Sequence, residues 1–320
     1  MKKRVFVTGA TGFAGSHLVD YLVNQDEYEI TGTYISDHSI ENVKEAKDKV
    51  RLVKVDLTDY EKTFQAIEQA APDFIYHLAA MPAVGDSYKK PAQFFTNNTT
   101  SQINILEAIR NLDLKDSRIL IVSSADVYGK VEEKDLPIDE ETPFNPTNTY
   151  AVSKIAQDFL GLQYFITYNL GIIRARPFNH MGPRQSTGFA VADFAKKIAQ
   201  IEKGEIEPIL LVGNLNTKRD FTDVRDIVRA YAILIQKGKA GDVYNIGSGT
   251  SHKMSDILDI LISLAKVKIK VEVADNLLRP EDAQDRICDS RKFAALTDWK
   301  PKISLHKTLQ DTLEYWRSIV

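Results

Sequence analysis

The segment Arg4-Val-Phe-Val-Thr-Gly9-Ala-Thr-Gly12-Phe-Ala-Gly15 constrains the architecture of this chain more than any other. A short β run leads into three glycines, and residues 14–24 then carry apolar side chains at helical spacing. Glycines at a strand-to-helix turn allow the backbone to approach a diphosphate closely, and the helix N-terminus attracts its negative charge. The segment therefore predicts the first β-α unit of a sheet that binds a dinucleotide.

The alternation of strand-like and helix-like segments continues well beyond this unit. Strands are expected at 29–34, 50–55, 74–78, 118–123 and 171–176, and helices at 60–71, 98–111 and 150–168. Alternation of this length is typical of βαβ crossovers, which are right-handed and cover both faces of a parallel sheet with helices. We therefore predict an α/β fold built on a doubly wound parallel sheet of the Rossmann type.

The pattern changes after about Arg176, where a Gly- and Pro-rich stretch at 177–188 is too long for a tight turn and suggests a binding loop. Helices at 189–203 and 224–236, strands at 209–212 and 243–246, and a tail with two or three helices and a strand at 268–273 are expected next. We assign residues 1–175, plus about 220–246, to the dinucleotide-binding domain. Residues 176–219 and 247–320 are expected to form a smaller C-terminal α/β substrate lobe.

Composition narrows the class of protein. The 320 residues are 43% hydrophobic and 27% charged with a net charge of −3, which fits an ordered globular chain and gives no support for a nucleic-acid partner. No apolar run approaches the roughly 18 residues of a membrane span, and the Met1-Lys-Lys-Arg start predicts no signal peptide. Cys288 is the single cysteine, which fits a reducing cytoplasm. The six histidines lack the spacing of a zinc motif, so no metal is expected.

Three residues are candidates for catalysis. Tyr150 and Lys154 lie one helical turn apart on the same face, and the lysine ammonium is expected to lower the tyrosine pKa from its usual value near 10. Ser124 directly follows a predicted strand, at the carboxyl edge where doubly wound sheets bind ligands, and its hydroxyl can hold a substrate oxygen. With the glycine loop, this trio predicts nicotinamide-dependent redox chemistry at a carbonyl or carbinol carbon.

Two further positions bear on the cofactor. Asp56 follows the third strand and can contact the adenine, although Thr58 and Glu61 also form a capping box that would simply start a helix. Both interpretations can hold together. The second strand ends Gly32-Thr-Tyr-Ile-Ser-Asp37, with no arginine and no acid at the position expected to contact the ribose, since Asp37 lies too far along the chain. NADP and NAD therefore both remain open.

Together these motifs resemble the extended short-chain dehydrogenase/reductase family, which includes sugar-nucleotide epimerases, dehydratases and reductases. The resemblance runs along the whole chain and also rests on His77-Leu-Ala-Ala80, Asn98, Tyr128-Gly129, Arg176-Pro-Phe-Asn179, Arg219-Asp-Phe221, Tyr244-Asn-Ile-Gly-Ser-Gly249 and Arg279-Pro280. The stretches 176–183 and 212–224 look most like the members that reduce GDP-4-keto-6-deoxy-D-mannose. The resemblance implies reduction of the sugar C4 ketone by NADPH or NADH, giving GDP-D-rhamnose.

The resemblance also implies which residues touch each ligand. For the cofactor they are Gly9, Thr11, Gly12, Phe13, Ala14, Gly15, Asp56, Leu57, Leu78, Ala79, Ala80, Asn98, Tyr150 and Lys154. For the GDP-sugar they are Ser87, Asp126, Asn179, Val212, Arg219 and Arg279. Helices 98–111 and 150–168 would pair across a homodimer. The chain departs from the family pattern at Ser101 and at Arg184, where glycine is usual.

Three alternatives to the reductase stay open. A dehydratase needs an extra acid and base, usually Thr followed by Asp-Glu or Ser-Glu, where this chain has Ser124-Ala125-Asp126. Alanine supplies no proton, and aspartate is one methylene shorter than glutamate, which argues against dehydration. A 4-epimerase needs only the trio and a retained NAD. A non-enzymatic NAD(P) sensor would keep the fold but lose the tyrosine or the lysine, and this chain keeps both.

Overall fold

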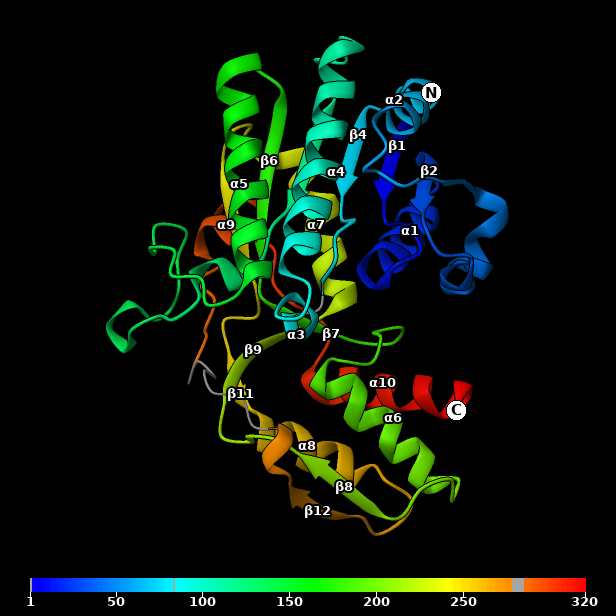
Figure 1. The fold of residues 1–320 in the computed structure, drawn as a ribbon, viewed down its shortest axis with the longest axis vertical. Coiled ribbons are helices and arrows are strands. Elements are labelled where there is room, and N and C mark those ends of the chain that lie inside the picture. The colour runs from blue at the N-terminus through cyan, green and yellow to red at the C-terminus, as the bar shows by residue number, and fades with distance from the viewer. Residues whose placement is uncertain (1, 83, 278–284) are drawn as a thin grey trace.

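The computed structural model describes residues 2–82, 84–277 and 285–320 and contains a seven-stranded parallel sheet (Figure 1). Its spatial order is β10-β6-β5-β4-β1-β2-β3. The strands are β1 (Lys3–Thr8), β2 (Tyr28–Tyr34), β3 (Val50–Lys54), β4 (Phe74–His77), β5 (Arg118–Val122), β6 (Gly171–Pro177) and β10 (Val243–Ile246). The strand order reverses between β1 and β4, which is where such sheets bind ligands. The predicted doubly wound α/β fold is confirmed.

Helices cover both faces of this sheet because its strands are apolar on both sides. On one face lie α1 (Phe13–Gln25), α7 (Val224–Lys237) and α9 (Arg291–Thr297), and on the other α2 (Tyr60–Ala70), α4 (Pro91–Asn111) and α5 (Thr149–Tyr168). Strand β1 shows the division, since Val5 and Val7 pack with the first set of helices and Phe6 with the second. Each fully buried side chain of this kind contributes about 1.5–3 kcal/mol to folding.

A second, smaller lobe has its own hydrophobic core and lies beyond the carboxyl edge of the sheet (Figure 1). It contains α6 (Ala190–Glu202), α8 (Met254–Ser263) and α10 (Leu305–Ile319), with the parallel pair β8 (Ile209–Val212) and β12 (Lys270–Val273). Helix α9 falls within the segment predicted for this lobe. Its Phe293, with the following Trp299, packs instead into the core of the large sheet.

A three-stranded sheet in the order β11-β9-β7 was not predicted from the sequence. Its strands are β7 (Asn179–Met181), β9 (Lys218–Asp223) and β11 (Ser251–Lys253), so the Gly/Pro-rich stretch is partly extended rather than a simple loop. Helix α4 also begins at Pro91, seven residues before the predicted start, because proline is well accommodated in a first helical turn. The remaining short elements are η1 (Asp37–Lys49), α3 (Val84–Ser87), η2 (Ala125–Tyr128), η3 (Glu133–Asp135) and η4 (Asp275–Leu277).

The described residues show neither a membrane-spanning helix nor a cluster of metal-binding side chains. None of their helices combines the length and the apolar character needed to cross a membrane. The same residues contain no group of three or more His, Cys, Asp or Glu side chains arranged to hold a metal ion.

Candidate active site

The glycine loop between β1 and α1 has the geometry of a diphosphate cradle. Gly9 has a φ of +65°, and a Cβ on Gly15 would lie 2.0 Å from the Gly9 carbonyl oxygen, so both positions require glycine. Gly12 is the N-cap of α1 and provides no side chain to cap the first-turn N–H groups. Those donors and the helix dipole suit a bound anion, so the loop fits the diphosphate of a dinucleotide.

The segment η1 folds over this loop from the side of β2. The Ser39 and Thr11 hydroxyl oxygens are 2.6 Å apart, and the Asn42 amide donates to the Thr11 carbonyl oxygen at 2.9 Å. Thr11 is thereby buried, while Phe13 and Ala14 remain partly exposed. No sequence pattern predicts this contact, because η1 is polar and has no regular apolar period.

The other predicted cofactor residues follow the carboxyl ends of β3 and β4. Asp56 is exposed, and its carboxylate accepts hydrogen bonds from the Thr58 N–H at 2.9 Å and hydroxyl at 2.7 Å, while Leu57 is buried. The predicted capping box is wrong, because Asp59 caps α2 by accepting from the Lys62 N–H. The three residues after β4 are partly exposed and line the same edge, namely Leu78, Ala79 and Ala80.

Three further predicted contact residues, outside the catalytic trio, have buried side chains. Asn98 is fully buried, and its amide joins the Met81 N–H at 2.8 Å to the Ser153 hydroxyl at 3.0 Å. It therefore ties the segment after β4 to helix α5. Ser87 donates its hydroxyl to the Val84 carbonyl oxygen, and Val212 belongs to the core of the smaller lobe.

The catalytic trio comes together at the carboxyl end of β5. Ser124 is the N-cap of η2, directly after this strand, and its side chain hydrogen-bonds the Tyr150 hydroxyl. Tyr150 lies in the first turn of α5 and is 9% exposed. The Lys154 ammonium lies 6.0 Å from the centre of the Tyr150 ring and donates to the Val122 carbonyl oxygen at 2.9 Å. The helical spacing of the pair therefore brings the Lys154 ammonium close to the Tyr150 ring.

Burial dominates the electrostatics of this trio. It raises the pKa of Tyr150 well above its usual value; the Asp126 carboxylate raises it further, and the Ser124 hydrogen bond lowers it. Burial also lowers the pKa of Lys154 to about 7. The direction for Tyr150 is opposite to the one expected from the sequence, because the phenol is deeply buried. The lysine ammonium, which was expected to lower this pKa, bonds a backbone carbonyl rather than the phenol oxygen. Tyr150 therefore remains protonated at neutral pH, as a proton donor should be.

Asp126 is held by a partner that the sequence did not suggest. Its carboxylate forms an ion pair with Arg286, whose side chain is 10% exposed and which also donates to the Gly129 carbonyl oxygen at 3.3 Å. The two residues are 160 positions apart, so no local pattern links them. Asp126 thus stands beside Tyr150 as one half of an ion pair.

The predicted substrate residues of the smaller lobe lie on neighbouring strands. Asn179 is exposed at the start of β7, whose register aligns it with Phe221 of β9. Arg219 lies two residues earlier in β9, is partly buried, and donates to the Lys218 carbonyl oxygen at 2.7 Å. Arg279, also predicted to contact the nucleotide, is outside the described residues.

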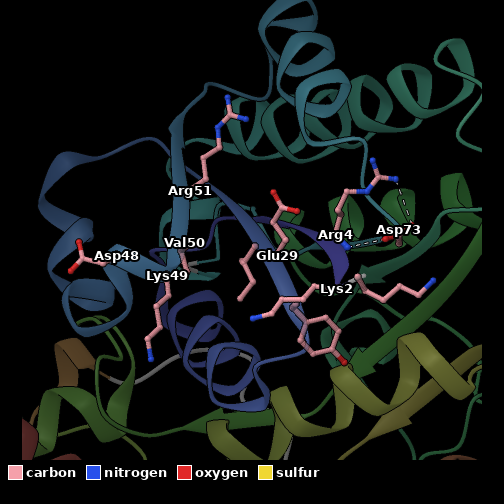
Figure 2. Close-up of a pocket in the computed structure, with 11 residues that line it drawn as sticks. Lys2, Arg4, Glu29, Asp48, Lys49, Val50, Arg51 and Asp73 are labelled. Carbon is pink, nitrogen blue, oxygen red and sulfur yellow. Dashed lines mark hydrogen bonds and ion pairs between the residues drawn. The ribbon is translucent and has the colours of Figure 1, made fainter.

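A cavity of about 1140 Å³ lies away from these residues, at the amino ends of β1, β2 and β3 (Figure 2). Its lining includes Lys2, Arg4, Lys49 and Arg51, and Figure 2 shows the Arg4–Asp73 contacts along its rim. No predicted site residue lines it. The candidate active site is therefore defined by its side-chain geometry at the opposite edge of the sheet.

Comparison with known proteins links this geometry to sugar-nucleotide enzymes. Residues 6–312 match the protein family described as GDP-mannose 4,6 dehydratase. GDP-6-deoxy-D-mannose reductase from Pseudomonas aeruginosa is 34% identical over 100% of this chain and 99% of its own length. The structure of RMD from Pseudomonas aeruginosa complexed with NADPH aligns with a TM-score of 0.86 and 32% identity over the full length of both chains. UDP-glucose 4-epimerase from Thermus thermophilus, solved with NAD, has a TM-score of 0.87 and 28% identity over 99% of this chain and 100% of its own.

Proposed function

The chain belongs to the GDP-mannose 4,6 dehydratase family, and from this premise we propose that it reduces the C4 ketone of GDP-4-keto-6-deoxy-D-mannose to give GDP-D-rhamnose. The proposal makes it an oxidoreductase that uses NADPH or NADH. The full-length likeness to a reductase of that substrate supports it, as does the likeness to structures that hold NADPH or NAD. The family description alone names a dehydratase, so the reductase must be distinguished from it by the residues of the site.

The ion pair between Asp126 and Arg286 makes this distinction. Dehydration requires an acid that protonates the leaving C6 hydroxyl, and Asp126 is the residue nearest to that role in the sequence. Its carboxylate forms an ion pair with the largely buried Arg286 guanidinium, so it is engaged by another side chain rather than free to meet the leaving hydroxyl. The Ala125 side chain beside it has no proton to donate. The site keeps the groups that a ketone reduction needs, and neither residue is an available acid for dehydration.

In the proposed mechanism the side chains bind the substrate oxygen and transfer its proton. The hydroxyls of Ser124 and Tyr150 hydrogen-bond the C4 ketone oxygen. A reduced nicotinamide, when bound, would supply the hydride to the sugar C4. Tyr150 donates its phenolic proton to the alkoxide oxygen, which a buried and protonated tyrosine is suited to do. Lys154 would hold the cofactor ribose.

Cofactor and substrate would be held by different parts of the chain. We assign the dinucleotide to Gly9, Gly12, Gly15 and the exposed edge after β3 and β4. The GDP-sugar would lie against the smaller lobe, with Asn179 and Arg219 facing its diphosphate. An arginine fork matches phosphate oxygens in geometry as well as charge, which supports this assignment.

A single assay separates the candidate reactions. Purified protein is given GDP-4-keto-6-deoxymannose with NADPH or NADH, and the absorbance of the reduced nicotinamide is followed. Loss of that absorbance in step with product formation is the expected result. Conversion of GDP-mannose without added cofactor would instead mark a dehydratase, and interconversion of UDP-hexoses an epimerase. Tight NAD(P) binding without any turnover would mark a sensor.

We also infer that the chain acts as a homodimer through α4 and α5. Val152, Phe159 and Ile166 recur every seven residues along α5 and are 41%, 51% and 69% exposed, and Phe95 of α4 is 41% exposed. Such a stripe along adjacent helices is typical of an interface. Light scattering should give a molar mass of two chains for the wild type and of one chain for Phe159→Glu.

We further infer that the protein acts in a reducing cytoplasm, which its single, buried Cys288 fits.

A further inference from the structure

Helix α1 carries a row of three contacts on the face turned toward the smaller lobe. Phe13, His17 and Asp20 follow one another at helical spacing, and each touches the segment that follows β6. The rings of Phe13 and His180 stack with centroids 5.8 Å apart and planes 9° apart. His17 Nε2 is 2.9 Å from the Pro183 carbonyl oxygen, and the Asp20 carboxylate is 2.7 Å from the Arg184 guanidinium. We call these three pairs the α1 contact row.

The row is partly buried and its members are suited to hold position. His17 is 7% exposed, and burial lowers its pKa to about 4, so the neutral ring can donate one N–H to the Pro183 carbonyl at pH 7. Arg184 has a φ of +68°, which a residue with a Cβ rarely adopts. The Asp20 ion pair supplies a favourable contact that helps to hold Arg184 in this conformation.

The same segment is tied down on its other side. The Gln185 amide donates to the His180 carbonyl oxygen at 3.1 Å, and β7 pairs with β9. Gly182 lies so close to α7 that a Cβ there would be 2.8 Å from a Val224 methyl group. The segment therefore has little freedom to shift along α1.

This anchoring sets the direction of Asn179. Successive side chains of a strand point to opposite faces. His180 is turned toward α1 by its stack on Phe13, so Asn179 is turned away from α1, where it is exposed. The glycine loop that opens α1 and the segment that carries Asn179 are thus fixed relative to each other by side chains outside the catalytic trio.

We propose that the α1 contact row positions Asn179 for the nucleotide sugar by fixing residues 178–184 against the cofactor helix. His17, Asp20, His180 and Arg184 are then positioning residues rather than catalytic ones. This inference rests on the proposed function, since it assigns Asn179 to the diphosphate of that substrate. It extends the proposed function, because the cofactor-binding helix α1 and the substrate-binding residue Asn179 then form one rigid unit.

Asp20→Asn tests the row because it removes the charge while keeping the shape. We expect the KM for GDP-4-keto-6-deoxymannose to rise about five-fold, with kcat and the NADPH Kd each changing less than about two-fold. Asp26→Asn is the matched control. Asp26 caps the other end of α1 and pairs only with the exposed Lys2 at 2.6 Å among the described residues, so the KM should stay unchanged.

The stacked pair gives a rescue test. His180→Ala should raise the same KM, while His180→Phe, which can stack on Phe13, should keep it within about two-fold of the wild type. Equal loss in both variants would mean that the stack does not act as proposed. A parallel rise in sugar KM and NADPH Kd for Asp20→Asn would overturn the inference, because the row would then merely support α1.

Hydrogen exchange separates this inference from the proposed function. Asp20→Asn should speed amide exchange in peptides covering 178–188 and leave α5 unchanged, whether or not any sugar is reduced. If the wild type reduces no nucleotide sugar, the proposed function fails, and the row is then judged by this exchange and by the Kd for GDP. If Asp20→Asn changes neither the amide exchange of 178–188 nor the KM or GDP Kd, the positioning role proposed for the α1 contact row is wrong.

Discussion

The Lys154 ammonium donates a hydrogen bond to the Val122 carbonyl oxygen at 2.9 Å, so the lysine is anchored to the end of β5 rather than to the Tyr150 hydroxyl. Its charge lies 6.0 Å from the centre of the tyrosine ring. The lysine ammonium is thereby held off the phenol oxygen, with which Ser124 interacts instead. This separation agrees with the proposal that Tyr150 donates the proton and Lys154 binds the cofactor.

Tyr150→Phe is expected to lower kcat about 10²- to 10⁴-fold, the usual effect of removing a general acid. The ring and its packing remain, so the Kd for NADPH should change little. Turnover is measured by nicotinamide absorbance, and NADPH binding by fluorescence titration. Near-normal turnover in this variant would refute the role assigned to the phenol.

Gly15→Ala tests the diphosphate cradle. The added methyl group would lie 2.0 Å from the Gly9 carbonyl oxygen, so the loop must open to accept it. We expect the NADPH Kd to rise at least about ten-fold, equivalent to about 1.4 kcal/mol. Gly85→Ala is the control, because its added methyl group meets nothing within 4 Å among the described residues. Similar affinities in the two variants would contradict a phosphate role for the loop.

The sequence predicts the large sheet well because its strands are local apolar runs. Strand β10 of this sheet has the predicted bounds, as does β8 of the smaller lobe, and α2 and α5 differ from theirs by one residue at one end. The short strands β7, β9 and β11 were missed for the opposite reason. The Lys218–Asp223 strand is mostly polar, and its pairing with Asn179 and Ser251 depends on residues far along the chain.

In the candidate site, too, the local features were predictable and those that depend on the tertiary fold were not. Helical spacing was enough to bring Lys154 close to Tyr150, and the strand end was enough to bring Ser124 beside it. The sign of the Tyr150 pKa shift was not predictable, because it depends on how deeply the completed fold buries the phenol. The partner of Asp126 was not predictable either, since only the tertiary fold brings Arg286 to it.

Lys154→Met is expected to change how stability depends on pH. The folded chain releases the Lys154 proton near pH 7, whereas the unfolded chain keeps it to about pH 10.5. Between these values the unfolded state binds more protons, so this residue makes wild-type stability rise with pH, by at most about 1.4 kcal/mol per pH unit. The methionine variant should lack that contribution and be more stable than the wild type at pH 6.5.

Urea unfolding of both proteins at pH 6.5, 8 and 9.5 checks this prediction, and the difference between them isolates Lys154 from other groups that titrate at alkaline pH. A constant difference over the three values would contradict it, because the lysine would then have its ordinary pKa.

His77→Gln addresses stability in acid. Burial lowers the pKa of His77 to about 3, so between pH 6.5 and about 3 the unfolded state binds a proton that the folded state does not. Stability should therefore fall as the pH falls through that range, by up to about 1.4 kcal/mol per unit from this residue. The variant should be less stable at pH 7, because it loses the contact with Thr8, yet its stability should fall less between pH 6.5 and 4.5. If the free energy of unfolding, measured with urea, changes equally with pH in the wild type and the variant, then burial does not lower the pKa of His77.

Asp126→Asn tests the electrostatic link between this carboxylate and Tyr150. The negative charge of Asp126 raises the pKa of Tyr150, so its removal should lower that pKa. Reduction uses the protonated phenol, and activity is lost as the pH rises through its pKa. The alkaline limb of the kcat/KM profile should therefore move to lower pH. Glu132→Gln, on the exposed segment beyond η2, should leave the profile unchanged. An alkaline limb that stays in place or moves to higher pH would contradict this link, because losing the Asp126 charge and freeing the Arg286 guanidinium both favour the phenolate.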